Sequence, residues 1–65
     1  MNSEELNREF VAVKDSAYRY AITLLRDRHA AEDAVQDLYE RLWRRRIFIR
    51  MTGFRSLVMT GMRNL

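Results

Sequence analysis

The sequence of 65 residues contains no cysteine and no proline, and it has only two glycines. Without cysteine the chain can form neither a disulfide nor a cysteine-ligated zinc site, so its stability must come from helix packing or from a partner. The longest apolar run has four residues, Phe10–Val13, which is too short to span a membrane. The N-terminus is acidic where a signal peptide would be basic and then apolar. We therefore expect a cytoplasmic protein with no membrane partner.

Residue types for catalysis are also scarce. The single histidine, His29, stands near the start of a predicted helix, and no Ser-His-Asp arrangement can be assembled around it. No glycine-rich loop is present to hold a phosphate. Asp33 and Asp37 share a helix face, but one face offers too few oxygens for a calcium site, and the spacing is not that of an EF-hand. We expect no catalytic residue, no metal and no cofactor, and so a binding module rather than an enzyme.

Acidic residues stop at Glu40. Residues 1–40 hold nine acidic and five basic residues, whereas residues 41–65 hold seven arginines and no acid. These arginines alternate with Trp43, Phe48 and Phe54, a composition that favours nucleic-acid binding because guanidinium groups pair with phosphate and rings stack on bases. A solvated charged surface is the plainer interpretation of the same run. An amphipathic peptide on an anionic membrane surface is another alternative.

Apolar residues at helical spacing predict three helices. Ser3 is the predicted cap of a first helix, which runs to about Arg26, and Asp27 is the predicted cap of a second, which runs to about Arg45. Residues 46–52 are interpreted as a packed linker. The fold class is then all-α, a three-helix bundle built on a long antiparallel helical hairpin, with residues 1–65 as one domain.

The third helix is the least regular of the three. Thr52 is its predicted cap, and Gly61 inside it costs about 1 kcal/mol relative to alanine. Trp43 is predicted to be a buried anchor of the hydrophobic core, and three methionines are predicted to fill gaps in that core. The predicted apolar face of the third helix comprises Phe54, Leu57, Val58, Met62 and Leu65. The three methionines are Met51, Met59 and Met62.

The second predicted helix has two faces of different character. An apolar stripe runs along one face, and a polar stripe of three acids and one amide runs along another. A basic segment follows at once, which indicates two partners of opposite charge. The apolar stripe comprises Ala31, Val35, Leu38 and Leu42, and the polar stripe comprises Asp33, Gln36, Asp37 and Glu40.

The motif Ala-Glu-Asp-Ala-Val-Gln-Asp at residues 31–37, followed by Leu42-Trp43, resembles the second conserved region of bacterial RNA polymerase sigma factors. The nearest subgroup is the small alternative sigma factors of the extracytoplasmic-function type. The likeness covers roughly residues 6–65, and its other parts are Phe10, residues 17–21, 24–27, 54–57 and 62–65.

The resemblance implies two macromolecular partners. In this family the middle helix docks on the clamp helices of the largest subunit of core RNA polymerase, a role that maps onto Asp33, Gln36 and Asp37, with Glu40 beside them. The third helix meets the −10 promoter element and holds the non-template strand, a role that maps onto Arg55, Arg63 and Asn64. An anti-sigma factor is a further partner that the resemblance suggests.

The sequence departs from the family pattern in two respects. Thr60 and Gly61 stand where primary sigma factors have a tryptophan pair, and Leu57 stands where many members have tryptophan. The chain also stops before the basic helix that reads the −10 sequence and before the −35-binding domain, so we expect a fragment or a remnant. The main competing hypothesis is a small helical dimerisation module without a nucleic-acid role.

Overall fold

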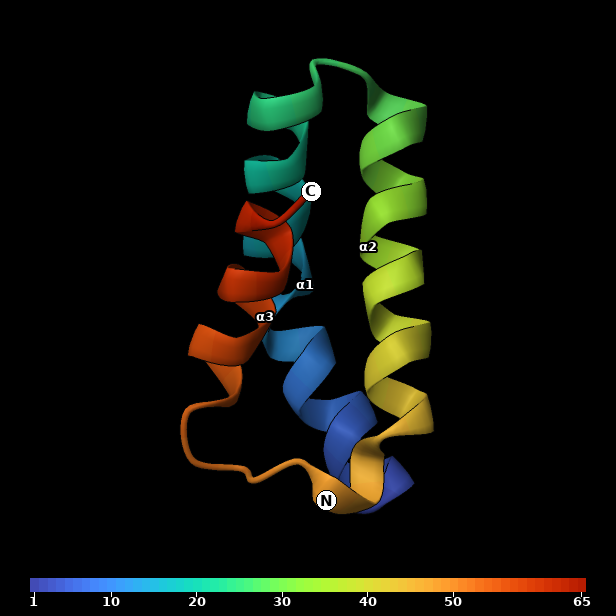
Figure 1. Ribbon diagram of the computed structural model, residues 1–65, viewed down its shortest axis with the longest axis vertical. Helices are drawn as coiled ribbons and strands as arrows, with labels where there is room; N and C mark the ends of the chain where they lie inside the picture. Colours follow the sequence, from blue (N-terminus) through green and yellow to red (C-terminus); the bar gives the residue numbers. More distant parts are fainter.

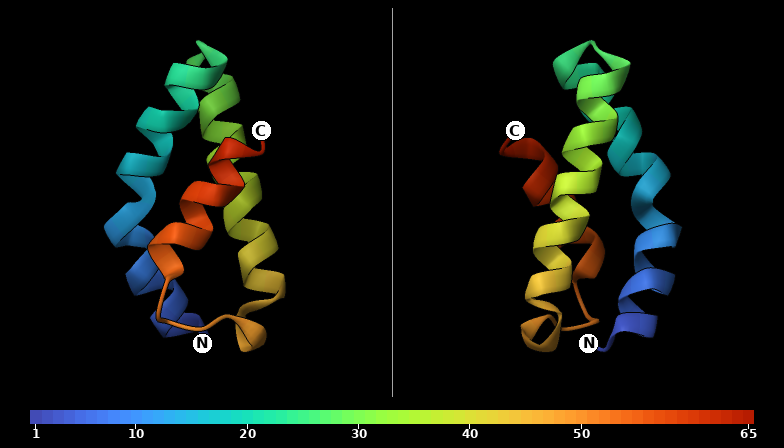
Figure 2. Two further views of the ribbon diagram at one scale, coloured as in Figure 1. Left: turned by 60° about the vertical axis from the view of Figure 1, so that its left-hand side comes forward. Right: turned by 90° about the vertical axis from the view of Figure 1, so that its right-hand side faces the viewer.

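Residues 1–65 are all described by the computed structural model, which is all-α. The helices are α1 (Ser3–Leu25), α2 (Arg28–Arg44) and α3 (Phe54–Arg63), with a 3₁₀ turn at Arg46–Phe48. Helices α1 and α2 form an antiparallel hairpin, and α3 packs across it (Figures 1 and 2). The molecule measures 32 × 18 × 17 Å. The predicted hairpin-based bundle is confirmed, and no helix is long and apolar enough to cross a bilayer.

The N-terminal cap of α1 lies one residue earlier than expected. The Asn2 side chain accepts a hydrogen bond from the Glu5 backbone N–H at 2.8 Å, and the Glu5 carboxylate accepts one from the Asn2 N–H at 2.9 Å. This reciprocal pair is a capping box, which satisfies two otherwise unpaired backbone donors. The prediction of Ser3 as the cap is therefore wrong, because Asn2 has both a competent side chain and an acid three residues later.

The turn between α1 and α2 consists of two residues, and both have a clear function. Arg26 adopts left-handed backbone angles, with φ of 54°, and its N–H donates to the Ile22 carbonyl at 2.7 Å, ending α1. Asp27 then caps α2 by accepting a hydrogen bond from the Ala30 N–H at 3.1 Å. The prediction of Asp27 as a cap is confirmed. So short a connection forces the two helices to run antiparallel.

The hydrophobic core is a single cluster of eleven apolar side chains with no buried polar group. Helix α1 supplies five of them, and α2 and α3 supply three each. Burial of this apolar surface is the main force that stabilises so small a chain. The members are Leu6, Phe10, Val13, Ala17, Ala21, Ala31, Leu38, Leu42, Phe54, Val58 and Met62.

The segment between α2 and α3 is only partly packed. Ile49 lies against the core, and its carbonyl accepts a hydrogen bond from the Met1 ammonium at 3.0 Å. Ile47 and Phe48 are instead 78% and 86% exposed, because the 3₁₀ turn points them outward. Met51 is exposed too. The predicted packed linker, with Met51 in the core, is therefore wrong except at Ile49.

The N-terminal cap of α3 is Gly53 rather than the predicted Thr52. Gly53 takes a φ of 81° and supplies no side-chain cap. Only Phe54, Val58 and Met62 of the predicted apolar face are buried, while Leu57 and Leu65 are exposed. The buried residues recur every four positions, and Leu57 lies to one side of that line, so the helix buries a narrower stripe than its sequence predicted.

Candidate functional site

The outward face of α2 carries the four polar residues that the sequence singled out. Asp33, Gln36, Asp37 and Glu40 are all exposed, and they lie on the side of α2 away from its buried residues. Successive members are three, one and three residues apart, so their side chains form one continuous surface. We call this surface the acidic face. Its position on a rigid helix, braced by the hydrophobic core, holds it in a fixed orientation.

One member of the acidic face already has a partner within the chain. Arg41 Nε donates to Asp37 Oδ2 at 3.0 Å, and a second nitrogen of the same guanidinium contacts the same oxygen. Both side chains are more than half exposed, so water screens this pair and it contributes little stability. The side chains of Asp33, Gln36 and Glu40 form no hydrogen bond within the chain. These three are available to another molecule without first losing a contact.

Three packed aromatic residues, Phe10, Tyr39 and Trp43, border the acidic face, and we call them the aromatic ladder. Tyr39 packs edge-on against Phe10 with ring centroids 4.9 Å apart, and its hydroxyl hydrogen-bonds Asn7. Trp43 follows one turn later, 6.2 Å from the Tyr39 ring, and the Arg46 guanidinium lies 4.3 Å from the centre of the indole. Trp43 remains 36% exposed, so the prediction that it is a buried core anchor is wrong. It lies at the surface because Leu42, its neighbour, takes the core position.

The C-terminal segment, residues 41–65, is strongly basic, and carboxylates of the chain neutralise little of its charge. Of the seven arginines in residues 41–65, only Arg41 lies within ion-pair distance of a carboxylate. Arg46 also donates to the Trp43 carbonyl at 2.8 Å, which ties the 3₁₀ turn to the end of α2. The remaining arginines carry uncompensated charge at the surface, where it attracts polyanions and acidic partners.

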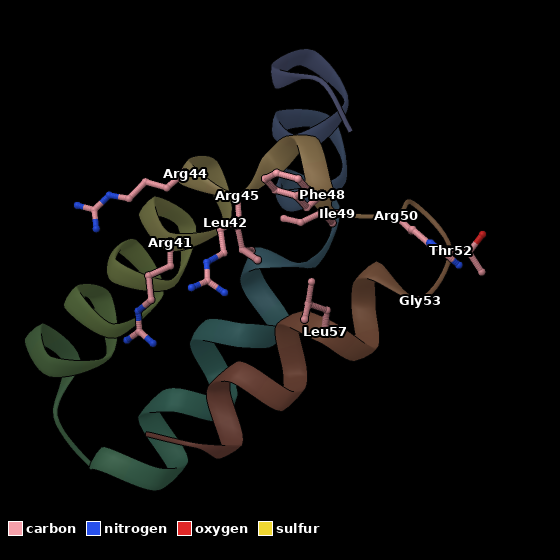
Figure 3. A pocket seen from close by; sticks show the side chains of 10 residues that line it. All are labelled: Arg41, Leu42, Arg44, Arg45, Phe48, Ile49, Arg50, Thr52, Gly53 and Leu57. Atoms are coloured by element: carbon pink, nitrogen blue, oxygen red, sulfur yellow. The ribbon is translucent and has the colours of Figure 1, made fainter.

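A groove of about 820 Å³ lies between the end of α2, the linker and the start of α3. Arg45 points into the space between α2 and α3, Arg44 points away from it, and Leu57 points from α3 toward the linker (Figure 3). We call this hollow the linker groove. Its lining is basic and apolar, with four arginines and four large apolar residues, which are Arg41, Arg44, Arg45 and Arg50, and Leu42, Phe48, Ile49 and Leu57.

The three residues predicted to contact DNA are exposed but do not share one side of α3. Arg55 and Arg63 are separated by Met59 at spacings of four, so they lie along one side. Asn64, just past the end of the helix, instead follows Leu57 and Thr60 on the other side. Arg55 and Arg63 are about 12 Å apart along the axis at about 1.5 Å per residue. They can therefore contact separate phosphates, but not a single one.

Two parts of this surface were not predicted from the sequence. The aromatic ladder was missed because Trp43 next to Leu42 looks like a second core residue. The linker groove was missed because residues 46–52 were interpreted as packed, although the exposure of Phe48 leaves a hollow beside it. No group of three or more histidine, aspartate or glutamate side chains is placed to hold a metal ion.

Comparison with known families gives one match. The family model described as Sigma-70 region 2 matches residues 10–65, which include all of α2 and α3 and most of α1. No curated protein and no solved structure matches the chain.

Proposed function

Because the chain belongs to the Sigma-70 region 2 family, we propose that it docks on core RNA polymerase through the acidic face and holds promoter DNA on α3. The family makes it a sigma-factor module for transcription initiation. The motif at residues 31–37 supports the narrower assignment to the extracytoplasmic-function subgroup. With polymerase and promoter as partners its place is the bacterial cytoplasm, and an anti-sigma factor would be a further partner.

The observation that carries the docking proposal is the unpaired state of Asp33, Gln36 and Glu40. Each is exposed on one helix face and has no partner within the chain. Carboxylates and an amide in this arrangement are complementary to a basic coiled coil such as the polymerase clamp helices. Asp37 contributes charge to the same face, but it would have to share its oxygens with Arg41.

The aromatic ladder supplies the apolar part of the proposed interface. Tyr39 and Trp43 line a hollow of about 330 Å³ together with Gln36, Glu40 and Arg44. Aromatic side chains half-buried beside polar ones are the usual energetic centre of a protein interface. We therefore expect Trp43 to contribute more to polymerase binding than any single carboxylate of the acidic face.

The proposed DNA surface consists of exposed residues on two sides of α3, with Arg55 and Arg63 along one side and Asn64 on the other. Arg55 and Arg63 are unpaired and would neutralise phosphates of the non-template strand of the −10 element, since guanidinium groups recognise phosphate well. Asn64 could donate to or accept from a base edge in an unpaired strand. Leu57 in place of an aromatic residue makes this surface depend more on charge than on stacking.

The docking proposal is tested by binding to core RNA polymerase. Asp33→Lys combined with Gln36→Ala should abolish binding while leaving helicity unchanged, because exposed substitutions usually alter stability by only about 0.5 kcal/mol. Glu4→Lys, an exposed charge reversal on α1, is the matched control and should bind as the parent does. Equal binding of the double variant and the parent would show that the acidic face is not the docking surface.

A further inference from the structure

We infer that the linker groove is a docking site for an acidic amphipathic helix of a partner protein. The groove lies at the end of α2 on the side that faces α3 (Figure 3), and none of the residues that line it belongs to the acidic face. The inference therefore stands independently of polymerase docking. It rests on three features of the groove, which are its charge, its apolar base and the residue types that it lacks.

The charge of the groove has a single sign. Arg41 and Arg45 stand one turn apart along one edge, and Arg50 lies on the linker at the opposite side. Arg45 and Arg50 have no carboxylate partner in the chain, and residues 41–65 contain no acid that could supply one. Helix α3 also starts at the groove without a side-chain cap, at Gly53. A partner that fits here must carry negative charge on both sides of its contact surface.

The base of the groove is aliphatic. Leu42, Ile49 and Leu57 come together from α2, the linker and α3, and Leu57, which lies beside the buried stripe of its helix, is 44% exposed. A helix that lies in such a groove covers the exposed apolar residue with its own leucines, and its charged residues meet the edges. Burial of Leu57 and Phe48 by such a helix would remove apolar surface from water.

The residue types that line the linker groove favour a peptide over a nucleic acid as its ligand. The lining includes no Asn, Gln, Asp or Glu, so only its arginines and Thr52 could contact the edge of a base. Phe48 is the one aromatic residue in it, whereas strands held without sequence preference stack successive bases on several rings. The aliphatic base suits leucine side chains instead, and the arginines suit glutamate as well as they suit phosphate.

The experiment uses the full 65-residue chain and a fluorescein-labelled 18-residue peptide of leucine, glutamate and alanine, with leucines at helical spacing on one face. The control peptide has the same composition with leucines on all faces. Fluorescence anisotropy should show the amphipathic peptide binding about tenfold more tightly than the control peptide. Leu57→Ala and Arg45→Ala should each raise the dissociation constant of the amphipathic peptide about tenfold, because each removes one well-placed contact. Amide chemical shifts should change in residues 41–53 and at Leu57.

Matched variants make the result specific. Val11→Ala removes an apolar residue that is 61% exposed on α1, and Arg19→Ala removes an exposed, unpaired arginine of the same helix, so both should change peptide affinity less than about twofold. Circular dichroism verifies that every variant is folded. Equal binding of the two peptides would mean that charge alone is recognised, and would overturn the inference. Oligothymidine that binds more tightly than the peptide and is equally sensitive to Leu57→Ala would overturn it in favour of a nucleic-acid strand.

Discussion

Gly61 of α3 lies directly against Leu38 of α2. A Cβ atom built on Gly61 would lie 3.3 Å from Leu38 Cδ2 and 2.8 Å from Leu38 Cδ1, and the second distance is shorter than real Cβ contacts. The absence of a side chain at Gly61 therefore lets Leu38 pack directly against the backbone of the third helix. Its cost in helix propensity, about 1 kcal/mol, is offset by the packing of Leu38 into the space that it leaves.

This contact predicts the effect of a larger side chain at position 61. Gly61→Leu should lower the free energy of unfolding by about 1–3 kcal/mol, because added atoms in a packed site displace neighbours. Thr60→Leu, at the exposed neighbouring position, should change it by less than about 0.5 kcal/mol. Urea unfolding followed by circular dichroism measures both. If the Leu38→Ala background fails to reduce the cost of Gly61→Leu, the two residues are not coupled as described.

The capping box at the start of α1 gives a second prediction. Asn2→Ala should cost about 1 kcal/mol, since it removes the acceptor for the Glu5 N–H. Ser3→Ala, the change at the residue that the sequence first suggested as the cap, should cost only a few tenths of a kcal/mol, because Ser3 makes no side-chain hydrogen bond. Thermal melting of the two variants under one buffer distinguishes the two caps. Equal losses would contradict the assignment to Asn2.

Trp43 and Phe54 form an informative pair for separating stability from binding. Phe54 is 4% exposed, so Phe54→Ala should cost about 3–5 kcal/mol and unfold much of this small domain. Trp43→Ala should cost only about 1–2 kcal/mol, because it loses its contacts with Tyr39 and Arg46 but opens no core cavity. The folded Trp43 variant should nevertheless bind core polymerase weakly. A Trp43 variant without helical circular dichroism would show that the ladder is structural.

Salt dependence tests the proposed DNA surface. Binding to a single strand should weaken with salt at a logarithmic slope of roughly −2 to −3, since each neutralised phosphate contributes about −0.7. Arg55→Ala and Arg63→Ala should each flatten that slope by about 0.7, while Asn64→Ala should leave it unchanged and alter base preference. Arg8→Ala, an exposed arginine on α1, is the control. A slope that responds to Arg8 as strongly as to Arg55 would indicate diffuse attraction instead.

The parts of the fold that were predictable from sequence are those governed by local rules. Asp27 acts on a backbone donor three residues away, and helical periodicity placed Leu38 and Leu42 in the core correctly. Phe48 was misplaced because an apolar residue in a short turn can point either way, and the outcome depends on the path of the linker around α1. The exposure of the acidic face followed from periodicity alone. Its role in docking remains a prediction.

Trp43 illustrates a different limit. Its sequence neighbours predict the core, yet adjacent helical residues point about 100° apart, and here Leu42 takes the core position. Which of two large apolar residues is buried depends on the orientation of the opposite helix, and here α1 places Phe10 against Tyr39, one turn before Trp43. Such a choice is tertiary, and no local pattern encodes it.

The division of the core among the helices has a consequence for motion. Helix α3 supplies three of the eleven buried side chains, and none of its contacts with the hairpin is a polar bond that would fix its register. Local opening of α3 therefore exposes less apolar surface than separation of α1 from α2. The amides of α3 should exchange with deuterium through this partial opening, while the buried amides of the hairpin should exchange only through global unfolding. The element proposed to hold DNA is thus also the one that can most readily detach.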